Sequence, residues 1–247
     1  MDPLTTAAAS GIRARLEALD MLANNIANAS APGFKADRDY FGQYMAAEAA
    51  DSPAGTNPVI SPVVEHQWTD FAQGSLAPTG NSFDIALSGK GFFVANSPGG
   101  PLFTRDGSLK LSPQGVLQTL DGYPIQGQDG KPIVLDAGKP VEILLDGTVR
   151  QDGQDISQLA IVDFKNPAAL AKRGNNYFGV DVSTSPPIPT NQAEVHQGSI
   201  EAANAQPAES AVRLVNVLRQ FETLQKALNI GTDMNKRVLD DVARIPQ

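Results

Sequence analysis

The sequence contains no cysteine, which excludes disulfide bonds, thiolate metal ligands and a cysteine nucleophile. No run approaches the roughly 18 consecutive apolar residues of a membrane-spanning helix, so no membrane insertion is expected. The N-terminus shows no basic region followed by an apolar core, and we expect no cleaved signal peptide. If the protein leaves the cytosol, it therefore needs a route that reads something other than a classical signal.

Basic residues are outnumbered by acidic ones. The chain has 19 Lys and Arg against 27 Asp and Glu, a formal net charge of −8 at pH 7. Binding to a nucleic-acid backbone requires clustered basic side chains that release counterions, and a membrane-surface helix also presents a basic face. We therefore expect no nucleic-acid partner, and we attribute the acidity to ordinary solubility.

Side chains suited to catalysis are few and scattered. The two histidines, His66 and His196, stand outside any metal-ligand spacing. Gly89-Lys90 resembles the end of a phosphate-binding loop, but Gly91 stands where Ser or Thr is needed for Mg²⁺ and Asp84 where the first glycine belongs. We therefore predict that the protein is not an enzyme and has no cofactor, metal or small-molecule substrate.

The first 30 residues are rich in Ala, Leu and Asn and predict an amphipathic helix. Large apolar residues recur at steps of three and four, the spacing of one helical face: Ile12, Leu16, Leu19, Leu22 and Ile26. The pattern stops at Pro32-Gly33, because proline disfavours helical dihedrals in the residue before it and glycine readily enters a turn. The helix is expected to end near Ala29.

A second, longer helix is predicted over residues 207–244, where Gly231 is the one glycine. Its apolar stripe has the same helical spacing: Leu214, Leu218, Phe221, Leu224 and Leu228. At 1.5 Å per residue this helix is about 50 Å long, more than a compact domain covers. Because the N-terminal helix offers a matching face, we expect the chain ends to form a coiled-coil-like stem.

Three asparagines, Asn24, Asn25 and Asn28, lie inside the first predicted helix. Each costs about several tenths of a kcal/mol relative to alanine at such a position. They are either exposed, or their amides pair across a helix–helix contact and set its register, as a buried Asn does in coiled coils. The sequence leaves both interpretations open.

Residues 36–75 read as an irregular connector with one extended piece near residues 59–68. Residues 76–200 predict a mainly antiparallel β domain, because short apolar runs alternate with Gly-containing turns. Asp106-Gly107 predicts a type I′ hairpin joining residues 102–105 to 108–111, and residues 156–164 form the longest strand-like run. The predicted core comprises Ile85, Leu87, Phe92, Phe93, Val94, Ile161, Val162 and Phe164. Because neighbouring strand residues alternate, only one of the two phenylalanines is expected to face inward.

The predicted fold is mainly β with α: discontinuous N- and C-terminal helices form a stem, and a β domain is inserted between them. The expected boundaries divide the chain into four parts: 1–35, the N-terminal helix; 36–75, the connector; 76–200, the β domain; and 201–247, the C-terminal helix.

Several separated segments match the motifs of one known family. Residues 19–29 (LDMLANNIANA) and 32–35 (PGFK) resemble the N-terminal signature of flagellar basal-body rod and hook proteins, with Ala31-Pro32 in place of the usual polar residues. Residues 197–204 (QGSIEAAN) and 219–222 (RQFE) resemble the C-terminal elements of that family. Four further segments match its central motifs: 73–76, 84–87, 89–93 and 103–107.

The resemblance implies a structural axial subunit of the flagellar rod, the drive shaft that crosses the periplasm. Its implied partners are copies of itself, other rod subunits and the flagellar type III export apparatus. The short chain, the opening Met1-Asp2 and the RQFE variant favour the proximal-rod subunit, with the distal-rod subunit as the alternative. The implied assembly interface comprises Ile12, Leu16, Leu19, Leu22, Asn24, Asn25, Ile26, Asn28, Leu214, Leu218, Phe221, Leu224 and Leu228.

A hypothesis from a different class is a secreted β-domain binding module for a glycan or surface polymer, oligomerised by its C-terminal helix. Such a module needs an exposed aromatic platform. Trp68, Tyr123 and Tyr177 are the candidates.

Overall fold

The computed structural model describes residues 3–45, 60–180, 185–190 and 192–243. The chain divides into two compact units, each assembled from segments far apart in the sequence. Unit 1 combines Met1–Ala27, Asp37–Trp68 and Gln206–Gln247, and unit 2 combines Asn28–Ala36 and Thr69–Ala205. Both chain ends therefore belong to unit 1, while the central β structure and a short N-terminal segment form unit 2.

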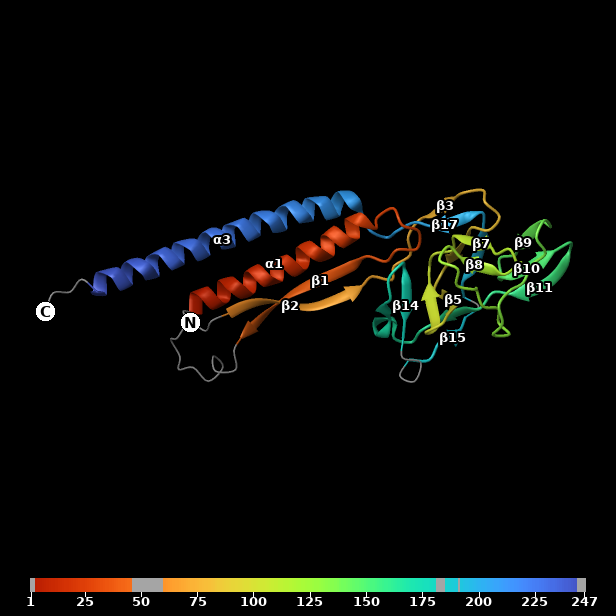
Figure 1. Cartoon of the computed structure of the whole chain (residues 1–247), viewed down its shortest axis with the longest axis horizontal. Coiled ribbons are helices and arrows are strands. Elements are labelled where there is room, and N and C mark those ends of the chain that lie inside the picture. Colours follow the sequence, from red (N-terminus) through yellow and green to blue (C-terminus); the bar gives the residue numbers. More distant parts are fainter. Residues whose placement is uncertain (1–2, 46–59, 181–184, 191, 244–247) are drawn as a thin grey trace. The chain divides into compact units, whose positions relative to one another are not determined.

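Unit 1 contains two long helices and a two-stranded sheet (Figure 1). Helix α1 spans Pro3–Ala27 and ends two residues before the predicted boundary. Helix α3 spans Pro207–Ala243 and begins at the predicted proline, whose missing N–H costs nothing in a first helical turn. The two helices lie side by side, and strand β1 packs against α1.

The predicted connector contains two long strands. Strand β1 (Asp37–Met45) pairs with β2 (Ile60–Thr69), and β2 coincides with the extended piece expected near residues 59–68. The local pattern missed β1 because its stability comes from the partner strand and from α1, which are non-local contacts. The Pro- and Gly-containing stretch 46–59 lies outside the described residues.

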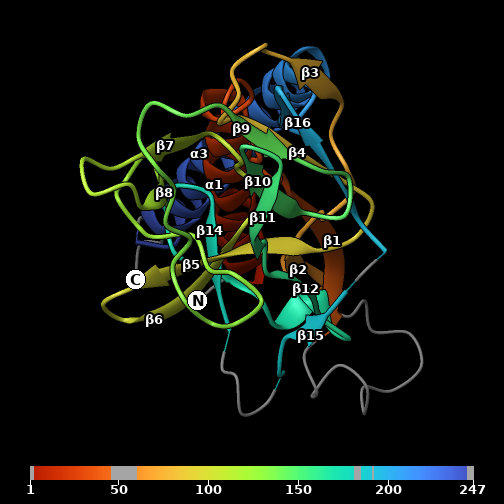
Figure 2. The same ribbon diagram turned by 90° about the vertical axis from the view of Figure 1, so that its right-hand side faces the viewer.

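Unit 2 contains strands β3 to β17 (Figures 1 and 2). A six-stranded sheet has the order β13 (Ala171–Lys172), β14 (Tyr177–Gly179), β6 (Gly100–Thr104), β5 (Phe92–Ser97), β12 (Ile161–Asp163) and β15 (Ile188–Pro189). A three-stranded sheet has the order β11 (Gln154–Gln158), β10 (Thr148–Gln151) and β9 (Val141–Ile143). Three pairs complete the unit: β16 (Glu194–Gln197) with β4 (Ile85–Ser88), β17 (Ser199–Glu201) with β3 (Leu76–Pro78), and β7 (Leu109–Leu111) with β8 (Leu117–Thr119).

Every strand pairing described in unit 2 is antiparallel. A short 3₁₀ helix, Pro167–Ala169, precedes β13. The prediction of a mainly β fold with antiparallel sheets and N- and C-terminal helices is therefore confirmed.

The core of unit 2 lies on both faces of strand β5. All eight predicted core residues are buried. Phe93 belongs to the larger cluster with Ile85, Leu87 and Ile161, whereas Phe92 belongs to a second cluster with Phe164. The prediction that only one of the two phenylalanines faces inward is wrong, because β5 is a central strand packed on both sides.

Two predictions about local β structure are also wrong. Strands β6 and β7, on either side of Asp106-Gly107, belong to different sheets and do not form a hairpin. The hairpin with two residues at positive φ occurs instead at Asp152-Gly153, between β10 and β11. The run 156–164 is divided between β11 and β12, again in separate sheets.

Candidate assembly site

Helix α3 carries two sets of apolar residues. One is half-buried within unit 1 and repeats at steps of three and four, as the a and d positions of a coiled coil do: Leu214, Val217, Phe221, Leu224 and Leu228. The other consists of residues whose side chains are 41–63% exposed: Val212, Val215, Leu218, Ile230 and Met234. Val217 occupies the half-buried position for which the sequence predicted Leu218. One chain therefore leaves these five apolar side chains of α3 exposed, and Val212, Val215 and Leu218 follow one another at steps of three as a short exposed apolar face.

Helix α1 is buried mainly through small side chains. Its buried positions include Gly11, Ala14, Ala18, Met21 and Leu22. Of the predicted ladder, Leu22 is buried, Ile12, Leu19 and Ile26 are half-buried, and Leu16 is 46% exposed. A search for large apolar residues overlooked the alanines, whose small side chains allow neighbouring elements to approach closely.

The prediction that three asparagines lie inside the first helix is wrong for Asn28, which follows the end of α1 at Ala27, and the three differ in their surroundings. Asn24 is exposed and Asn28 is half-buried, whereas Asn25 is buried. The Asn25 amide forms two hydrogen bonds with the backbone of Asp37: Nδ2 donates to the Asp37 carbonyl at 2.7 Å, and Oδ1 accepts from the Asp37 N–H at 3.0 Å. The structure thus gives Asn25 a partner in β1, where the sequence suggested a helix–helix register contact.

Within unit 2, the motif segments converge on a buried ion cluster. The Glu201 carboxylate accepts from Lys35 Nζ at 2.5 Å through Oε1 and from Arg105 Nη1 at 3.2 Å through Oε2. The three side chains are at most 5% exposed. Lys35 comes from the PGFK segment, Arg105 from residues 103–107, and Glu201 from residues 197–204. The motifs that suggested the family are therefore neighbours in space.

Backbone groups add hydrogen bonds to the ion cluster, although the buried Arg105 Nε has no partner among the described residues. Gly74 N–H donates to Glu201 Oε1 at 2.9 Å, Lys35 Nζ donates to the Ala72 carbonyl at 2.8 Å, and Arg105 Nη2 donates to the Gly89 carbonyl at 2.7 Å. These bonds compensate for removing the charges from water. Burial lowers the pKa of Lys35 and that of Arg105, and the Glu201 carboxylate partly opposes both changes.

The Asn204 side chain forms hydrogen bonds with the other segments at which the chain passes between unit 2 and unit 1. Its Oδ1 accepts from Ala36 N–H at 2.7 Å, while Nδ2 donates to the carbonyls of Asp70 at 2.6 Å and Ala72 at 3.0 Å. Ala36, Asp70 and Asn204 each lie within two residues of a point where the chain passes between units. We call Lys35, Arg105, Glu201 and Asn204 the latch cluster, because it fixes these segments within unit 2.

Two motif glycines allow backbones to meet beside the latch cluster. A Cβ at Gly33, whose φ is +66°, would lie 2.3 Å from Asp106 N, and a Cβ at Gly74 would lie 1.9 Å from the Ala202 carbonyl oxygen. Neither position has room for a side chain. These glycines therefore act through packing of the β unit.

Replacing Gly33 with alanine is expected to destabilise unit 2 by about 2–5 kcal/mol, since the left-handed conformation costs about 1–2 kcal/mol and the overlap adds about 1–3 kcal/mol. Gly80→Ala is the matched control, because Gly80 also has positive φ, at +75°, but no atom within 4 Å of an added Cβ. Urea denaturation followed by tyrosine near-ultraviolet circular dichroism measures both. Equal losses would show that close approach at Gly33 contributes nothing.

The described residues offer little that could support chemistry. They contain no group of three or more His, Asp or Glu side chains able to hold a metal ion. Within the same part of the chain, neither helix is long and apolar enough to span a membrane. His196 lies on β16 with Nε2 3.6 Å from a carboxylate oxygen of Glu194, and His66 belongs to β2.

The aromatic residues considered for a binding platform are not all exposed. Tyr177 is buried, and its ring contacts Tyr123 with centroids 5.5 Å apart. Trp68 is 47% exposed but belongs to unit 1, whereas both tyrosines belong to unit 2. The platform required by the binding-module hypothesis is therefore not formed by these three rings.

Unit 1 contributes a long helix with exposed apolar side chains, and unit 2 contributes a β unit whose motif segments meet at the latch cluster, two features that favour a structural assembly protein. Comparisons with known proteins agree. The family described as "Flagella basal body rod protein" matches residues 6–35, "Flagellar hook protein FlgE/F/G D1 domain" matches 86–154, and "Flagellar basal body rod FlgEFG protein C-terminal" matches 196–241.

Curated relatives match over most of their length. The chain is 32% identical to the flagellar basal-body rod protein FlgF of Caulobacter vibrioides, covering 92% of each chain. It is 30% identical to FlgG of Buchnera aphidicola subsp. Schizaphis graminum, covering 93% of this chain and 95% of the relative. It is 32% identical to FlgF of Mesorhizobium japonicum over 83% of both. The chain belongs to the flagellar basal-body rod protein family.

Membership in this family settles the broad function. The protein is a structural subunit of the flagellar basal body and not an enzyme. Rod proteins assemble with other subunits of the flagellar rod.

Proposed function

We propose that this chain is an axial subunit that polymerises through its terminal helices into the helical drive shaft of the flagellum. The observation that carries the proposal is the exposed apolar face of α3, represented by Val212, Val215 and Leu218. At about 25 cal/mol per Å² of apolar surface, covering such a face favours association. Helices from neighbouring copies would pack against this face and remove it from water.

The coiled-coil-like stem is part of this proposal. The heptad spacing of Leu214, Val217, Phe221, Leu224 and Leu228 suits packing against α1, and α1 lies beside α3. The exposed face then contacts a different copy. Such a contact joins two unlike surfaces, and its repetition by one screw operation builds a helical tube that does not close. Long helices along that tube resist twisting, as torque transmission requires.

Within the rod, we propose the proximal position for this subunit, with the distal position as the alternative. The support is the sequence pattern of the RQFE segment at residues 219–222. Basal bodies purified from a strain lacking the protein discriminate between the two positions. Loss of every more distal rod subunit is expected for a proximal subunit, whereas their retention contradicts that assignment.

We further propose that the chain reaches the envelope through the flagellar type III export apparatus without cleavage of a signal peptide. A chain free of cysteine needs no oxidative folding step on the way. Mass spectrometry of the protein from purified basal bodies tests this proposal. An intact N-terminus is expected, and a truncated N-terminus would contradict it.

Replacing Leu218 with aspartate is expected to abolish rod assembly and swimming. The substitution places a charge on the exposed face, where an assembled neighbour would bury it without a partner. Because Leu218 is 41% exposed in the single chain, the isolated protein should keep its thermal transition. Swimming in soft agar and recovery of basal bodies measure the effect, with the exported amount of protein checked by immunoblot.

The matched control is Gln220→Asp, which adds the same charge on the same helix at an exposed polar position. Its carrier is expected to swim normally. Normal swimming of the Leu218→Asp strain would mean that this face does not contact another subunit in the rod. Equal loss in both strains would show that charge on α3, and not the apolar face, is responsible.

A further inference from the structure

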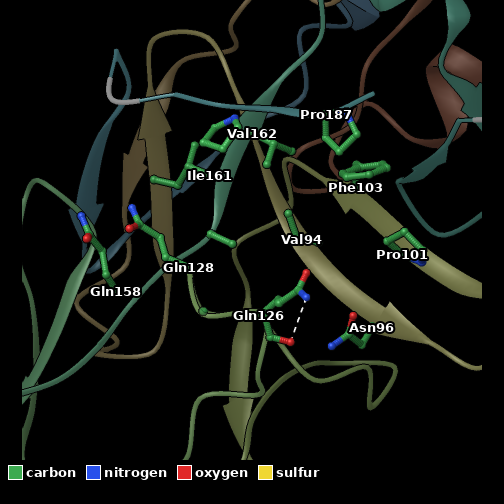
Figure 3. Close-up of a pocket in the computed structure, with 14 residues that line it drawn as sticks. Val94, Asn96, Pro101, Phe103, Gln126, Gln128, Gln158, Ile161, Val162 and Pro187 are labelled. Carbon is green, nitrogen blue, oxygen red and sulfur yellow. Dashed lines mark hydrogen bonds between the residues drawn. The ribbon is translucent and has the colours of Figure 1, made fainter. Parts of the chain in front are cut away.

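Unit 2 contains a pocket that the assembly of helices does not use. Its volume is about 590 Å³, within the roughly 300–1,000 Å³ range of small-ligand sites. All fourteen residues that line it belong to unit 2, between Val94 and Pro189 (Figure 3). The pocket therefore exists whether or not α1 and α3 meet other subunits.

The floor of the pocket is one face of the six-stranded sheet. On β5 and β6, Val94 pairs with Phe103 and Asn96 with Pro101, so alternate residues of both strands point to the same side. Phe103 and Val94 also belong to the second core cluster. The pocket thus lies on the face of the sheet to which Val94 and Phe103 of that cluster belong.

Carboxamide side chains border this apolar floor. Residues 124–128 extend the sheet, because Ile125 bridges Ala95 and Gly127 bridges Leu159. This pairing places Gln126 next to Val94 and Gln128 next to Gln158, as Figure 3 shows. Together with Asn96, these residues give the pocket four primary amides.

Most of the hydrogen-bonding capacity of these amides is not used by the part of the chain that the structure describes. Gln126 Nε2 donates to the Gly130 carbonyl at 3.0 Å, and Gln158 Nε2 donates to the Asp146 carbonyl at 2.9 Å, which leaves both Oε1 acceptors. The side chains of Asn96 and Gln128 form no hydrogen bond with the described residues. Each primary amide offers two donors and an acceptor, so the rim can recognise paired donor and acceptor groups.

The charge of the pocket restricts the class of ligand. None of the fourteen lining residues is ionisable, although the chain carries a formal net charge of −8. A charged ligand would lose its hydration here without gaining an ion partner. The chemistry of the lining therefore fits an uncharged ligand with apolar faces and hydroxyl or amide edges.

The sheet beneath the pocket argues against an extended peptide. Peptides recognised by sheets usually add a strand at a free edge through main-chain hydrogen bonds. Here β5 is paired with β6 on one side and with β12 on the other, and β12 is paired with β15. Side-chain amides are therefore the polar groups best placed for recognition, which suits a ligand whose own polar groups are hydroxyls.

We propose that this pocket binds a neutral oligosaccharide. The carboxamides of Asn96 and Gln128 bond to hydroxyl or acetamido groups. The C–H faces of the sugar rings lie against the accessible prolines of the lining, Pro101, Pro187 and Pro189, which take the place of an aromatic platform. The binding site is independent of the assembly face on α3. The proposal gives this rod-family subunit a glycan contact in addition to its protein contacts.

Titration of the ¹⁵N-labelled full chain with chitotriose, and separately with cellotriose, tests the proposal by amide chemical shifts. Half-saturation is expected near millimolar concentration for at least one sugar, with the largest shifts in residues 94–103 and 126–130. Stronger binding of chitotriose would identify acetamido groups as the recognised feature, and equal binding would identify hydroxyls. No shift with either sugar at about 20 mM overturns the proposal.

Variants connect the binding to the pocket. Asn96→Ala and Gln128→Ala are each expected to weaken binding about fivefold, which corresponds to loss of one ordinary hydrogen bond. Neither side chain forms a hydrogen bond with the described residues, so both variants should fold, and their spectra verify it. Gln154→Ala, an exposed carboxamide on β11 outside the pocket, is expected to bind normally.

The remaining outcomes are equally informative. Unchanged binding in both pocket variants overturns the site, and binding of an uncharged proline-containing peptide in place of the sugars overturns the ligand class. The Leu218→Asp chain should bind the sugars like the wild type. Failure of the assembly proposal and failure of this one are therefore separable.

Discussion

Glu201→Gln is expected to destabilise unit 2 by about 3–5 kcal/mol, because it removes the carboxylate that pairs with two buried cations. The substitution keeps the size of the side chain and an oxygen that can accept from Gly74 N–H. The loss therefore reports the unpaired charges of Lys35 and Arg105, which are buried beside it. Urea denaturation of the full chain measures the change in the free energy of unfolding.

Two further variants separate charge from shape in the latch cluster. Glu194→Gln alters an exposed carboxylate of the same region and is expected to cost less than about 0.5 kcal/mol. Adding Lys35→Met to Glu201→Gln should cost less than the sum of the two single changes, because one of the uncompensated cations is then absent. A Glu201→Gln loss below about 1 kcal/mol would contradict the buried pairing.

The same substitution should change how stability depends on pH. Burial already lowers the pKa of Lys35 below its ordinary value of 10.5, and loss of Glu201 removes the main interaction that raises it. Between the folded pKa and 10.5 the unfolded chain binds more protons than the native chain, so stability rises with pH. This rise should be larger in Glu201→Gln than in the wild type. The difference between the free energies of unfolding of the two proteins should therefore become smaller as the pH approaches 10.5. A constant deficit would contradict the role of Lys35.

Phe93→Ala and Phe92→Ala are each expected to cost about 3–5 kcal/mol, because both rings are buried and each leaves a cavity. Phe93 packs in the larger core cluster, while Phe92 contacts Phe71, Phe164 and Phe178 in edge-to-face geometry on the other side of the sheet. Thermal denaturation measures both losses.

The control for these truncations is Leu120→Ala, whose side chain is 59% exposed and should cost less than about 0.5 kcal/mol. A negligible loss of stability at one of the two phenylalanines would support the original prediction that only one face of β5 packs in the core. Negligible losses at both would contradict the assignment of β5 to the core.

The helices were the part of the structure most readily predicted from sequence. Their apolar spacing and the prolines and glycines at their ends are local signals, so α1 ended within two residues of its predicted boundary and α3 began at Pro207. The residues on the buried side of α1 were predicted less well. Ala14 and Ala18 are inconspicuous in a pattern search, and their burial depends on neighbouring elements.

Strand pairing was predicted less well. Asp106-Gly107 has ideal hairpin chemistry, yet a Cβ at Gly107 would lie 1.7 Å from the Ile85 carbonyl oxygen. That glycine permits close approach to β4 and does not close a hairpin between β6 and β7. Local turn propensity cannot distinguish the two roles, because the deciding contact comes from a strand about twenty residues away.

By itself, the sequence determined the class of this protein: two terminal helices around a β region, no constellation for catalysis, and the motifs of a flagellar rod subunit. Tertiary structure alone decided what those motifs do. Lys35 and Glu201 are 166 residues apart, and their pairing depends on the sheets that bring β17 beside residues 33–36. The physical reason is that helical periodicity repeats within a few residues, whereas a buried charge is stable only where the folded chain delivers its partner.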